Sequence, residues 1–193
     1  MKRICVFCGS SAGEDPRYLD AADRFGNILA REGIELVYGG SRVGMMGRLA
    51  AATLQAGGKV VGIIPGAVMN RELAHQELTE LRVVKSLHER KSEMADLSDA
   101  FVALPGGLGT TEAFFELLTW AQLGLHQKPC AMLDVAGYFQ PLVRFFDHMT
   151  HEGFMARPHR DMVLVEEDPE ELVRRLRSYQ PPATPRWITP GQT

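Results

Sequence analysis

The chain has few cysteines, no block of basic residues and no long apolar run. Three cysteines in 193 residues are too few for a disulfide scaffold, and their odd number favours a reducing compartment such as the cytoplasm. A net charge of −3 without a basic cluster does not predict binding to nucleic acid. No apolar segment approaches the roughly 20 residues that cross a bilayer, so no membrane partner is predicted either.

What remains is the composition of a globular protein. Hydrophobic residues make up 45% of the chain and charged residues 23%, and the length suits one domain with a substantial core. No linker or internal repeat divides the sequence. We therefore expect a single α/β domain over residues 1–179, followed by a proline-rich tail over residues 180–193.

Strand-like and helix-like patterns alternate along the whole chain. Strands are expected near 3–7, 34–38, 59–64, 81–85, 99–104, 128–133 and 162–165. Helices are expected near 15–32, 43–56, 86–97, 110–125, 138–152 and 168–178, and the weak segment 67–80 predicts a loop with a short helix around 71–78. Repeated β-then-α units of this length predict a doubly wound parallel sheet with helices on both faces.

Glycine-rich turns follow three of the predicted strands, at Cys8–Gly13, Gly39–Gly40 and Gly106–Gly109. In a parallel sheet these turns meet at the carboxyl edge, where ligands bind. The third turn follows the strand that we expect at the centre, and Thr110 stands where the N-cap of the next helix belongs. Glycine amides at a helix N-terminus attract anions, so this turn predicts a phosphate site. It has neither the lysine of a P-loop nor a dinucleotide fingerprint.

A charged segment, Leu87-His88-Glu89-Arg90-Lys91-Ser92-Glu93-Met94, falls on a predicted helix. Helical spacing puts Arg90 on the same face as Met94, and Lys91 on the same face as Leu87. Periodicity alone favours a solvated charged surface over a binding site.

Metal and redox chemistry have little support in the sequence. Cys5 and Cys8 form a C-x-x-C pair, but residues three apart on a strand point to opposite faces. We interpret both as small buried hydrophobic residues. The six histidines lack metal-ligand spacing and are expected at the surface or at helix ends, so no metal site is predicted.

Five motifs occur together in a fixed order: Tyr38-Gly39-Gly40, Val43-Gly44-Met45-Met46-Gly47, His88-x-Arg90-Lys91, Pro105-Gly106-Gly107-Leu108-Gly109-Thr110 and Trp120-Ala121-Gln122-Leu123-Gly124. Through them the chain resembles the LOG (Lonely Guy) family of cytokinin riboside 5′-monophosphate phosphoribohydrolases, often mislabelled lysine decarboxylases. The resemblance runs from Cys5 to about Asp161. It implies a Rossmann-like fold and a homodimer or larger assembly. It also implies release of the free base and ribose 5-phosphate from AMP and N6-prenylated AMP, with no metal or organic cofactor.

The resemblance also implies roles for single residues. Arg90 matches the family's catalytic arginine, which stays protonated and can hydrogen-bond the departing base or orient a carboxylate. Met94 would pack on the purine, and the 5′-phosphate would lie on the amides at the start of the helix after the third turn. The residues expected around the substrate are Ser10, Gly40, Glu72, Lys91, Met94, Gly106, Gly107, Leu108, Gly109, Thr110, Thr111 and Thr119.

One position departs from the family pattern. The family motif continues P-G-G-x-G-T-x-x-E and ends on the catalytic glutamate, but that position is Ala113 in this chain. Three explanations compete: an engineered Glu→Ala change, a natural homologue that binds nucleotides without hydrolysing them, or takeover by Glu112 or Glu116. Glu116 lies a helical turn away, too far for accurate placement. We expect Glu112 to contact the ribose, and the site to be engineered or degenerate.

Two rival functions remain to be weighed. A non-catalytic nucleotide sensor or carrier would use the same phosphate cradle and differ only in releasing no base. A true lysine decarboxylase is disfavoured, because pyridoxal phosphate needs a lysine and none here follows a strand in a suggestive context.

Overall fold

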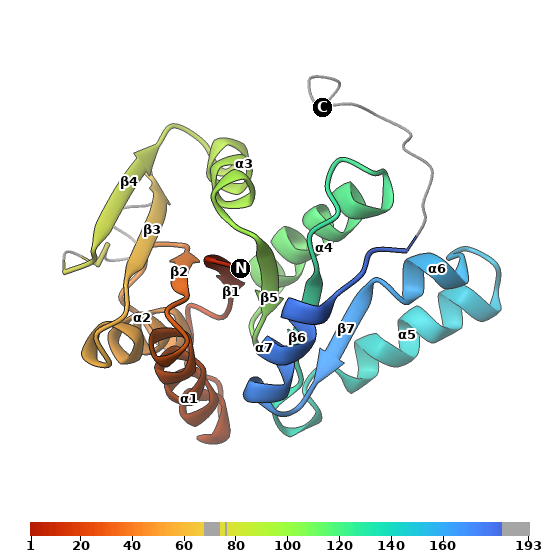
Figure 1. The fold of residues 1–193 in the computed structure, drawn as a ribbon, viewed down its shortest axis with the longest axis horizontal. Helices are drawn as coiled ribbons and strands as arrows, with labels where there is room; N and C mark the ends of the chain where they lie inside the picture. Colours follow the sequence, from red (N-terminus) through yellow and green to blue (C-terminus); the bar gives the residue numbers. More distant parts are fainter. Residues whose placement is uncertain (68–73, 76, 183–193) are drawn as a thin grey trace.

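The computed structural model describes residues 1–67, 74, 75 and 77–182. Its strands form one all-parallel, seven-stranded sheet in the order β4-β3-β2-β1-β5-β6-β7 (Figure 1). They are β1 (Arg3–Phe7), β2 (Glu35–Tyr38), β3 (Val60–Pro65), β4 (Glu80–Val84), β5 (Ala100–Ala103), β6 (Cys130–Leu133) and β7 (Val163–Glu166). The predicted doubly wound α/β fold is confirmed.

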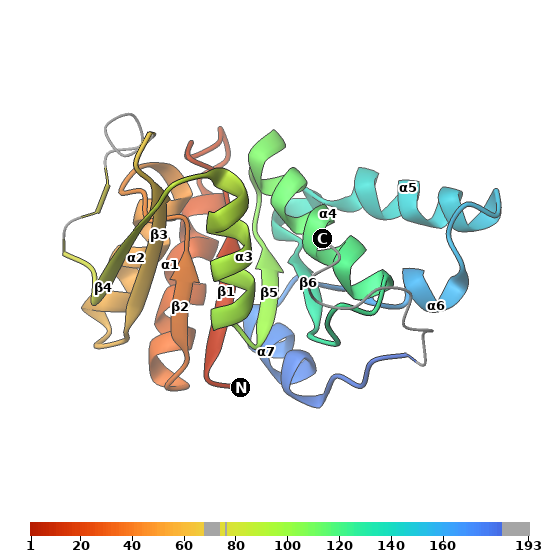
Figure 2. The same cartoon turned by 90° about the horizontal axis from the view of Figure 1, so that it is seen from above.

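Helices cover both faces of the sheet. They are α1 (Arg17–Arg31), α2 (Gly44–Gln55), α3 (Leu87–Leu97), α4 (Leu108–Gln122), α5 (Gln140–His151), α6 (Arg157–Arg160) and α7 (Pro169–Ser178), with a short 3-10 helix η1 (Val135–Gly137). Helices α1, α2 and α7 contribute to the core on one face, and α3, α4 and α5 to the core on the other. Figure 2 shows α5 and α6 beyond β6, at the end of the sheet away from β4. No helix among the described residues is long and apolar enough to span a membrane.

Strand β1 shows why the sequence folds this way. Ile4 and Val6 pack into the core beneath α1 and α2, whereas Cys5 and Phe7 pack into the core beneath α3 and α4. A strand buried on both faces needs a continuous apolar run rather than an alternating one. Cys8 joins the core opposite to Cys5, and both are free and buried, so the C-x-x-C pair is two small hydrophobic residues as predicted.

The strand order of the sheet reverses at its middle strand: β2 to β4 follow on one side of β1, and β5 to β7 on the other. β1 pairs with β2 on one side and with β5 on the other, where Cys5 lies beside Val37 and Phe101 respectively. The middle strand is therefore β1, and the strand after residue 99 lies next to it rather than at the centre. Because the turns after β1 and β5 leave in different directions, they open a crevice at the carboxyl edge.

Three local predictions differ from the structure. Helix α4 begins at Leu108, so Thr110 is inside its first turn and Gly107 is the N-cap, without a side-chain cap hydrogen bond. Thr110 is not an N-cap because Gly107 already takes the extended conformation that starts the helix. Short helices η1 and α6 were not predicted, since they lack an apolar period of their own. Half of the helix expected at 71–78 lies outside the described residues, and the described residues 74, 75, 77 and 78 are not helical.

His126 is not a surface histidine but holds the end of α4 against the sheet. Its Nε2–H donates to the carbonyl of Leu117 at 2.9 Å, and its Nδ1 accepts from the amide of Lys128 at 3.1 Å. Its ring packs against Phe101 at 5.1 Å between centroids. Burial lowers the pKa of His126 to about 4, outweighing the opposite effect of the bond to Leu117.

The folded protein should therefore lose stability in mild acid. The unfolded chain binds a proton at His126 from about pH 6.5 downward while the folded chain does not until about pH 4, so unfolding is favoured as the pH falls through that window. We expect a loss of about 1–2 kcal/mol between pH 7 and pH 5, measured by urea denaturation. His126→Gln should remove this component. His151→Gln, at a position with an 84% exposed side chain, is the matched control and should leave it in place.

Candidate active site

A cavity of about 510 Å³ opens at the carboxyl edge of the sheet, beside the junction of β1 and β5. Its walls come from the ends of β1 and β2, from α3, and from the turn and first helical residues after β5. The lining residues are Val6, Phe7, Cys8, Ser10, Gly39, Met46, Leu87, Arg90, Lys91, Met94, Gly107, Leu108, Gly109, Thr110, Glu112 and Ala113.

The starts of α2 and α4 differ in how their N-terminal amides are bonded. At the start of α2, the amides of Met45 and Met46 donate to the carbonyls of Ser11 and Gly9, at 3.4 and 3.2 Å. The loop after β1 therefore satisfies the α2 end and closes it to a ligand.

The start of α4 is open. Within the described part of the chain, the N–H groups of Gly107, Gly109 and Thr110 donate to no protein acceptor. Gly107, Gly109 and Thr110 all line the cavity. Unpaired amides at the positive end of a helix dipole form a site for an anion such as a phosphate.

The glycines of this turn have two different tasks. A Cβ at Gly106 would lie 2.2 Å from the hydroxyl oxygen of Thr110 and 2.8 Å from the amide nitrogen of Gly9, so Gly106 is needed for packing. A Cβ at Gly107 or Gly109 would meet no protein atom within 4 Å. Those two glycines leave open the space through which an anion would approach the amides.

Arg90 lies against the ends of two strands rather than in solvent. Its Nε donates to the carbonyl of Ile63 at 3.0 Å, and its Nη2 donates to the carbonyl of Gly39 at 2.7 Å. A Cβ at position 39 would lie 2.0 Å from Nη2, so Gly39 makes room for the guanidinium. The solvated-surface interpretation of this helix is wrong for Arg90, because its guanidinium donates to two backbone carbonyls in the cavity wall.

Lys91 is also turned inward and bridges two carboxylates of α4. It forms a hydrogen-bonded ion pair with Glu112, and its Nζ lies 2.7 Å from Oε2 of Glu116. Partial burial acts to lower the pKa of Lys91, but the two carboxylates outweigh it, so the pKa is raised and the side chain stays charged. Glu112 lines the cavity, whereas Glu116 lies outside its wall.

Ala113 is 7% exposed and lines the cavity one residue beyond Glu112. It also packs into the core that α3 and α4 share with the sheet. The position that the family pattern gives to a glutamate is therefore at the cavity wall, and in this chain it carries a methyl group. Within the described residues, the carboxylate that lines the cavity is that of Glu112.

The structure brings most of the predicted site residues together. Those that line the cavity are Ser10, Arg90, Lys91, Met94, Gly107, Leu108, Gly109, Thr110, Glu112 and Ala113. Gly106 and Thr111 lie behind the turn, the hydroxyl of Thr111 bonding back to the carbonyl of Gly107 at 3.2 Å. Gly40 is buried beneath the strand end and Thr119 is exposed further along α4, so neither contacts the cavity. Glu72 lies outside the described residues.

Other wall residues were not predicted as site residues: Val6, Phe7, Cys8, Gly39, Met46 and Leu87. Cys8 and Gly39 each follow a strand directly, and ligands of a parallel sheet bind beyond the carboxyl ends of its strands. That position could have identified both as site residues. Burial raises the pKa of Cys8 to about 12, so its thiol is a neutral part of the wall and not a nucleophile.

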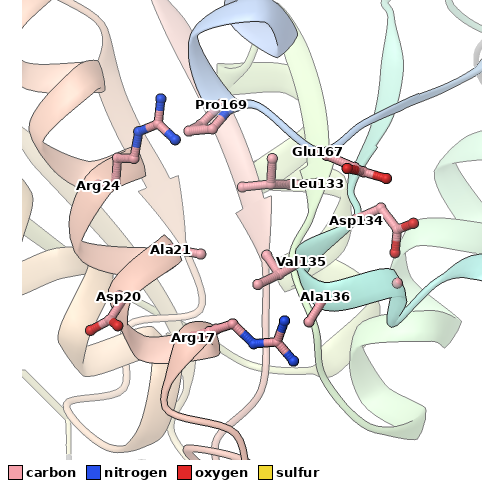
Figure 3. Close-up of a pocket in the computed structure, with 11 residues that line it drawn as sticks. Arg17, Asp20, Ala21, Arg24, Leu133, Asp134, Val135, Ala136, Glu167 and Pro169 are labelled. Carbon is pink, nitrogen blue, oxygen red and sulfur yellow. The ribbon is translucent and has the colours of Figure 1, made fainter.

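A second cavity, of about 550 Å³, lies at the same edge between α1 and the loop that follows β6 (Figure 3). Its two arginines are already paired: Arg17 binds Asp15 at 2.6 Å and Arg24 binds Asp168 at 2.6 Å. It has no counterpart of the open α4 terminus, so it is the poorer anion site.

Among the described residues, no three His, Cys, Asp or Glu side chains are grouped to hold a metal ion.

A doubly wound parallel sheet with an open helix N-terminus at its switch point defines a Rossmann-like α/β protein. Solved structures share the fold. The molybdenum cofactor carrier protein of Chlamydomonas reinhardtii matches with a TM-score of 0.70 at 23% identity, over 92% of this chain and 99% of that one. The molybdenum cofactor binding protein of Rippkaea orientalis matches with a TM-score of 0.69 at 22% identity, over 92% and 97%.

Closer relatives narrow the class to one family. Residues 46–176 match the family described as "Possible lysine decarboxylase". The cytokinin riboside 5′-monophosphate phosphoribohydrolase LOG7 of Arabidopsis thaliana is 47% identical over 93% of this chain and 83% of its own. The phosphoribohydrolase of the same name from Rhodococcoides fascians is 48% identical over 92% and 90%. The chain belongs to the LOG family, as its motifs predicted.

The two tasks of the glycine turn can be separated by substitution. Gly107→Ala should lower the free energy of unfolding by about 1 kcal/mol or less, the cost of alanine at an N-cap, because φ is −90° and the added methyl meets no protein atom within 4 Å. It should nevertheless weaken binding of inorganic phosphate by about tenfold, measured by calorimetry. Gly106→Ala should instead cost about 1–3 kcal/mol of stability through overpacking. Equal phosphate affinity in Gly107→Ala and the unmodified protein would contradict an anion site on these amides.

Proposed function

We propose that this protein is built as a nucleoside 5′-monophosphate phosphoribohydrolase, which hydrolyses the N-glycosidic bond of AMP and N6-prenylated AMP. The products are the free base, as a cytokinin or adenine, and ribose 5-phosphate. The observation that carries the proposal is one cavity that combines the open α4 amides with Arg90. Membership of the LOG family supports it, since relatives at 47–48% identity carry the name of this activity.

The chemistry assigns a task to each part of the cavity. The 5′-phosphate lies on the amides of Gly107, Gly109 and Thr110, and Met94 packs on the purine. The bond between C1′ and the base nitrogen breaks, its electron pair leaves with the base, and positive charge develops on the ribose. Arg90 is held by two strand carbonyls and donates a hydrogen bond to the departing base, which is then protonated. Water attacks C1′ and gives up a proton.

Among the residues that the structure describes, the cavity has no evident carboxylate for two tasks: stabilising the positive charge on the ribose and taking the proton from the attacking water. In this reaction a carboxylate near C1′ stabilises the cation or takes the proton from water. Position 113 offers a methyl group, and Glu112 is tied to Lys91. We therefore propose that this chain binds its nucleotide well and releases base slowly, without a metal or organic cofactor.

Base release from AMP and from isopentenyladenosine monophosphate, followed by chromatography, tests the proposal. The unmodified chain should bind both and release little base. Ala113→Glu should raise the rate by about 10²- to 10⁴-fold, the usual contribution of a positioned carboxylate. Ala113→Gln, equal in size but uncharged, should not.

Two other outcomes have distinct meanings. Brisk turnover by the unmodified chain would overturn our assignment for position 113, and Glu112→Gln would then show whether Glu112 replaced the missing carboxylate. Binding without base release that Ala113→Glu leaves unchanged would select the alternative, a non-catalytic nucleotide sensor or carrier. The alanine at 113 is the observation that favours this alternative.

We further propose a homodimer or larger assembly formed through α3 and α4. Phe115 and Trp120 on α4 are only partly buried, and Leu87 and Leu108, at the starts of the two helices, are 57% and 90% exposed. Large apolar groups gathered beside a cavity favour a protein partner. Light scattering at micromolar concentration should give at least twice the mass of one chain, 21.4 kDa. A monomer under these conditions would exclude the assembly.

The three free, buried cysteines support a place in the cytoplasm. We also propose that residues 1–179 act as one nucleotide-binding domain, with 180–193 as a tail.

A further inference from the structure

Tyr138 links the loop after β6 to the glycine turn of the cavity. Its hydroxyl donates to the carbonyl of Gly106 at 2.5 Å. Its ring packs edge-to-face on Tyr18 and on Phe139, with centroids 5.7 and 5.1 Å apart. Tyr138 does not line the cavity, so it would act on a ligand only through the turn.

The carbonyl that Tyr138 binds belongs to the same peptide unit as the amide of Gly107. A trans peptide is planar, and its C=O and N–H point in opposite directions. The bond to Tyr138 therefore fixes the peptide with the N–H of Gly107 directed away from Tyr138. It also polarises that peptide, because hydrogen bonds in a chain strengthen one another. Gly107 lines the cavity, and its N–H has no protein acceptor in the described part of the chain.

The position of Tyr138 is itself set by a buried carboxylate. Asp134 is 1% exposed, and its oxygens accept from the amide of Phe139 at 2.7 Å and from the side chain of Gln140 at 2.5 Å. Between Asp134 and Tyr138 the chain passes through two successive residues in the left-handed conformation, Ala136 at φ 56° and Gly137 at φ 74°. The amide of Tyr138 then bonds to the carbonyl of Val135 at 3.1 Å. This bonding holds the loop in one shape, so the hydroxyl is presented to the turn before any ligand arrives.

We infer that Tyr138 is a positioning residue for the 5′-phosphate of the substrate: it orients and polarises the Gly106–Gly107 peptide so that the Gly107 amide is a stronger donor to that phosphate. The inference rests on the proposed function and names a residue outside the cavity on which that function depends. A purely structural tyrosine would support all ligands of the cavity equally, whereas this role concerns the phosphate alone.

Binding of AMP and of adenosine, measured by calorimetry, distinguishes a phosphate-positioning tyrosine from a purely structural one. Tyr138→Phe keeps the ring and its stacking but removes the hydroxyl. It should weaken AMP binding by about three- to tenfold, the range for one lost hydrogen bond, and leave adenosine binding unchanged. The affinity for inorganic phosphate should fall by a similar factor. Tyr18→Phe is the matched control, because Tyr18 belongs to the same ring stack and its hydroxyl has no partner in the described structure, so both affinities should stay the same.

Failure of this inference and failure of the proposed function look different. If the unmodified protein binds no AMP, the proposed function fails. If it binds AMP and Tyr138→Phe changes AMP and adenosine affinity equally, or changes neither, the role of Tyr138 is overturned. Should Tyr138→Phe not fold, site-specific incorporation of 3-fluorotyrosine at position 138 offers the opposite change. A more acidic hydroxyl is a stronger donor and should tighten AMP relative to adenosine, and an unchanged ratio would refute the inference.

Discussion

The site depends on one close approach between two backbone turns. Gly9, after β1, donates its amide to the carbonyl of Pro105, after β5, at 3.0 Å. A Cβ on Gly106 would lie 2.8 Å from the Gly9 nitrogen, and one on Gly9 would lie 3.3 Å from the Cα of Gly106, so the contact requires glycine on both sides. Because neighbouring strands at the switch point are joined in this way, the first turn of α4 has a fixed place relative to the sheet.

The same contact explains why, in the described part of the chain, the N-terminal amides of α2 are hydrogen-bonded within the protein and those of α4 are not. The loop that begins at Gly9 continues to Ser11, and its carbonyls satisfy the start of α2. Among the described residues, no equivalent segment bonds to the start of α4, whose first residues line the cavity. Two cations also stand in the wall: Arg90 donates to the carbonyls of Ile63 and Gly39, and Lys91 pairs with Glu112 and Glu116.

Much of this arrangement could be predicted from the sequence. The alternation of apolar runs and helical periods gave the parallel sheet, because strands buried on both faces carry unbroken apolar segments such as Ile4–Phe7. Glycines after strands located the cavity edge. The inward position of Arg90 could not be derived from helical periodicity, since the carbonyls that it binds belong to Gly39, directly after β2, and to Ile63 in β3, which are distant in sequence. The family motif supplied what periodicity could not.

Other features escaped prediction because they depend on contacts across the sheet. Nothing local marks His126 as half-buried or Tyr138 as a partner of Gly106, which is 32 residues away. The start of α4 was placed two residues late because a side-chain cap was expected where a glycine serves instead. In each case the local signal was outweighed by a tertiary hydrogen bond or by backbone geometry.

An anion held by neutral amides differs from one held by lysines in its sensitivity to ionic strength. Lone surface cations are surrounded by counterions and lose much of their attraction as salt is added. The α4 terminus carries only partial charges, and the charge of Lys91 is already offset by Glu112 and Glu116. A phosphate seated there would exchange water for directed hydrogen bonds rather than displace an ion cloud. Its retention would therefore depend less on ionic strength than binding to lone surface lysines does.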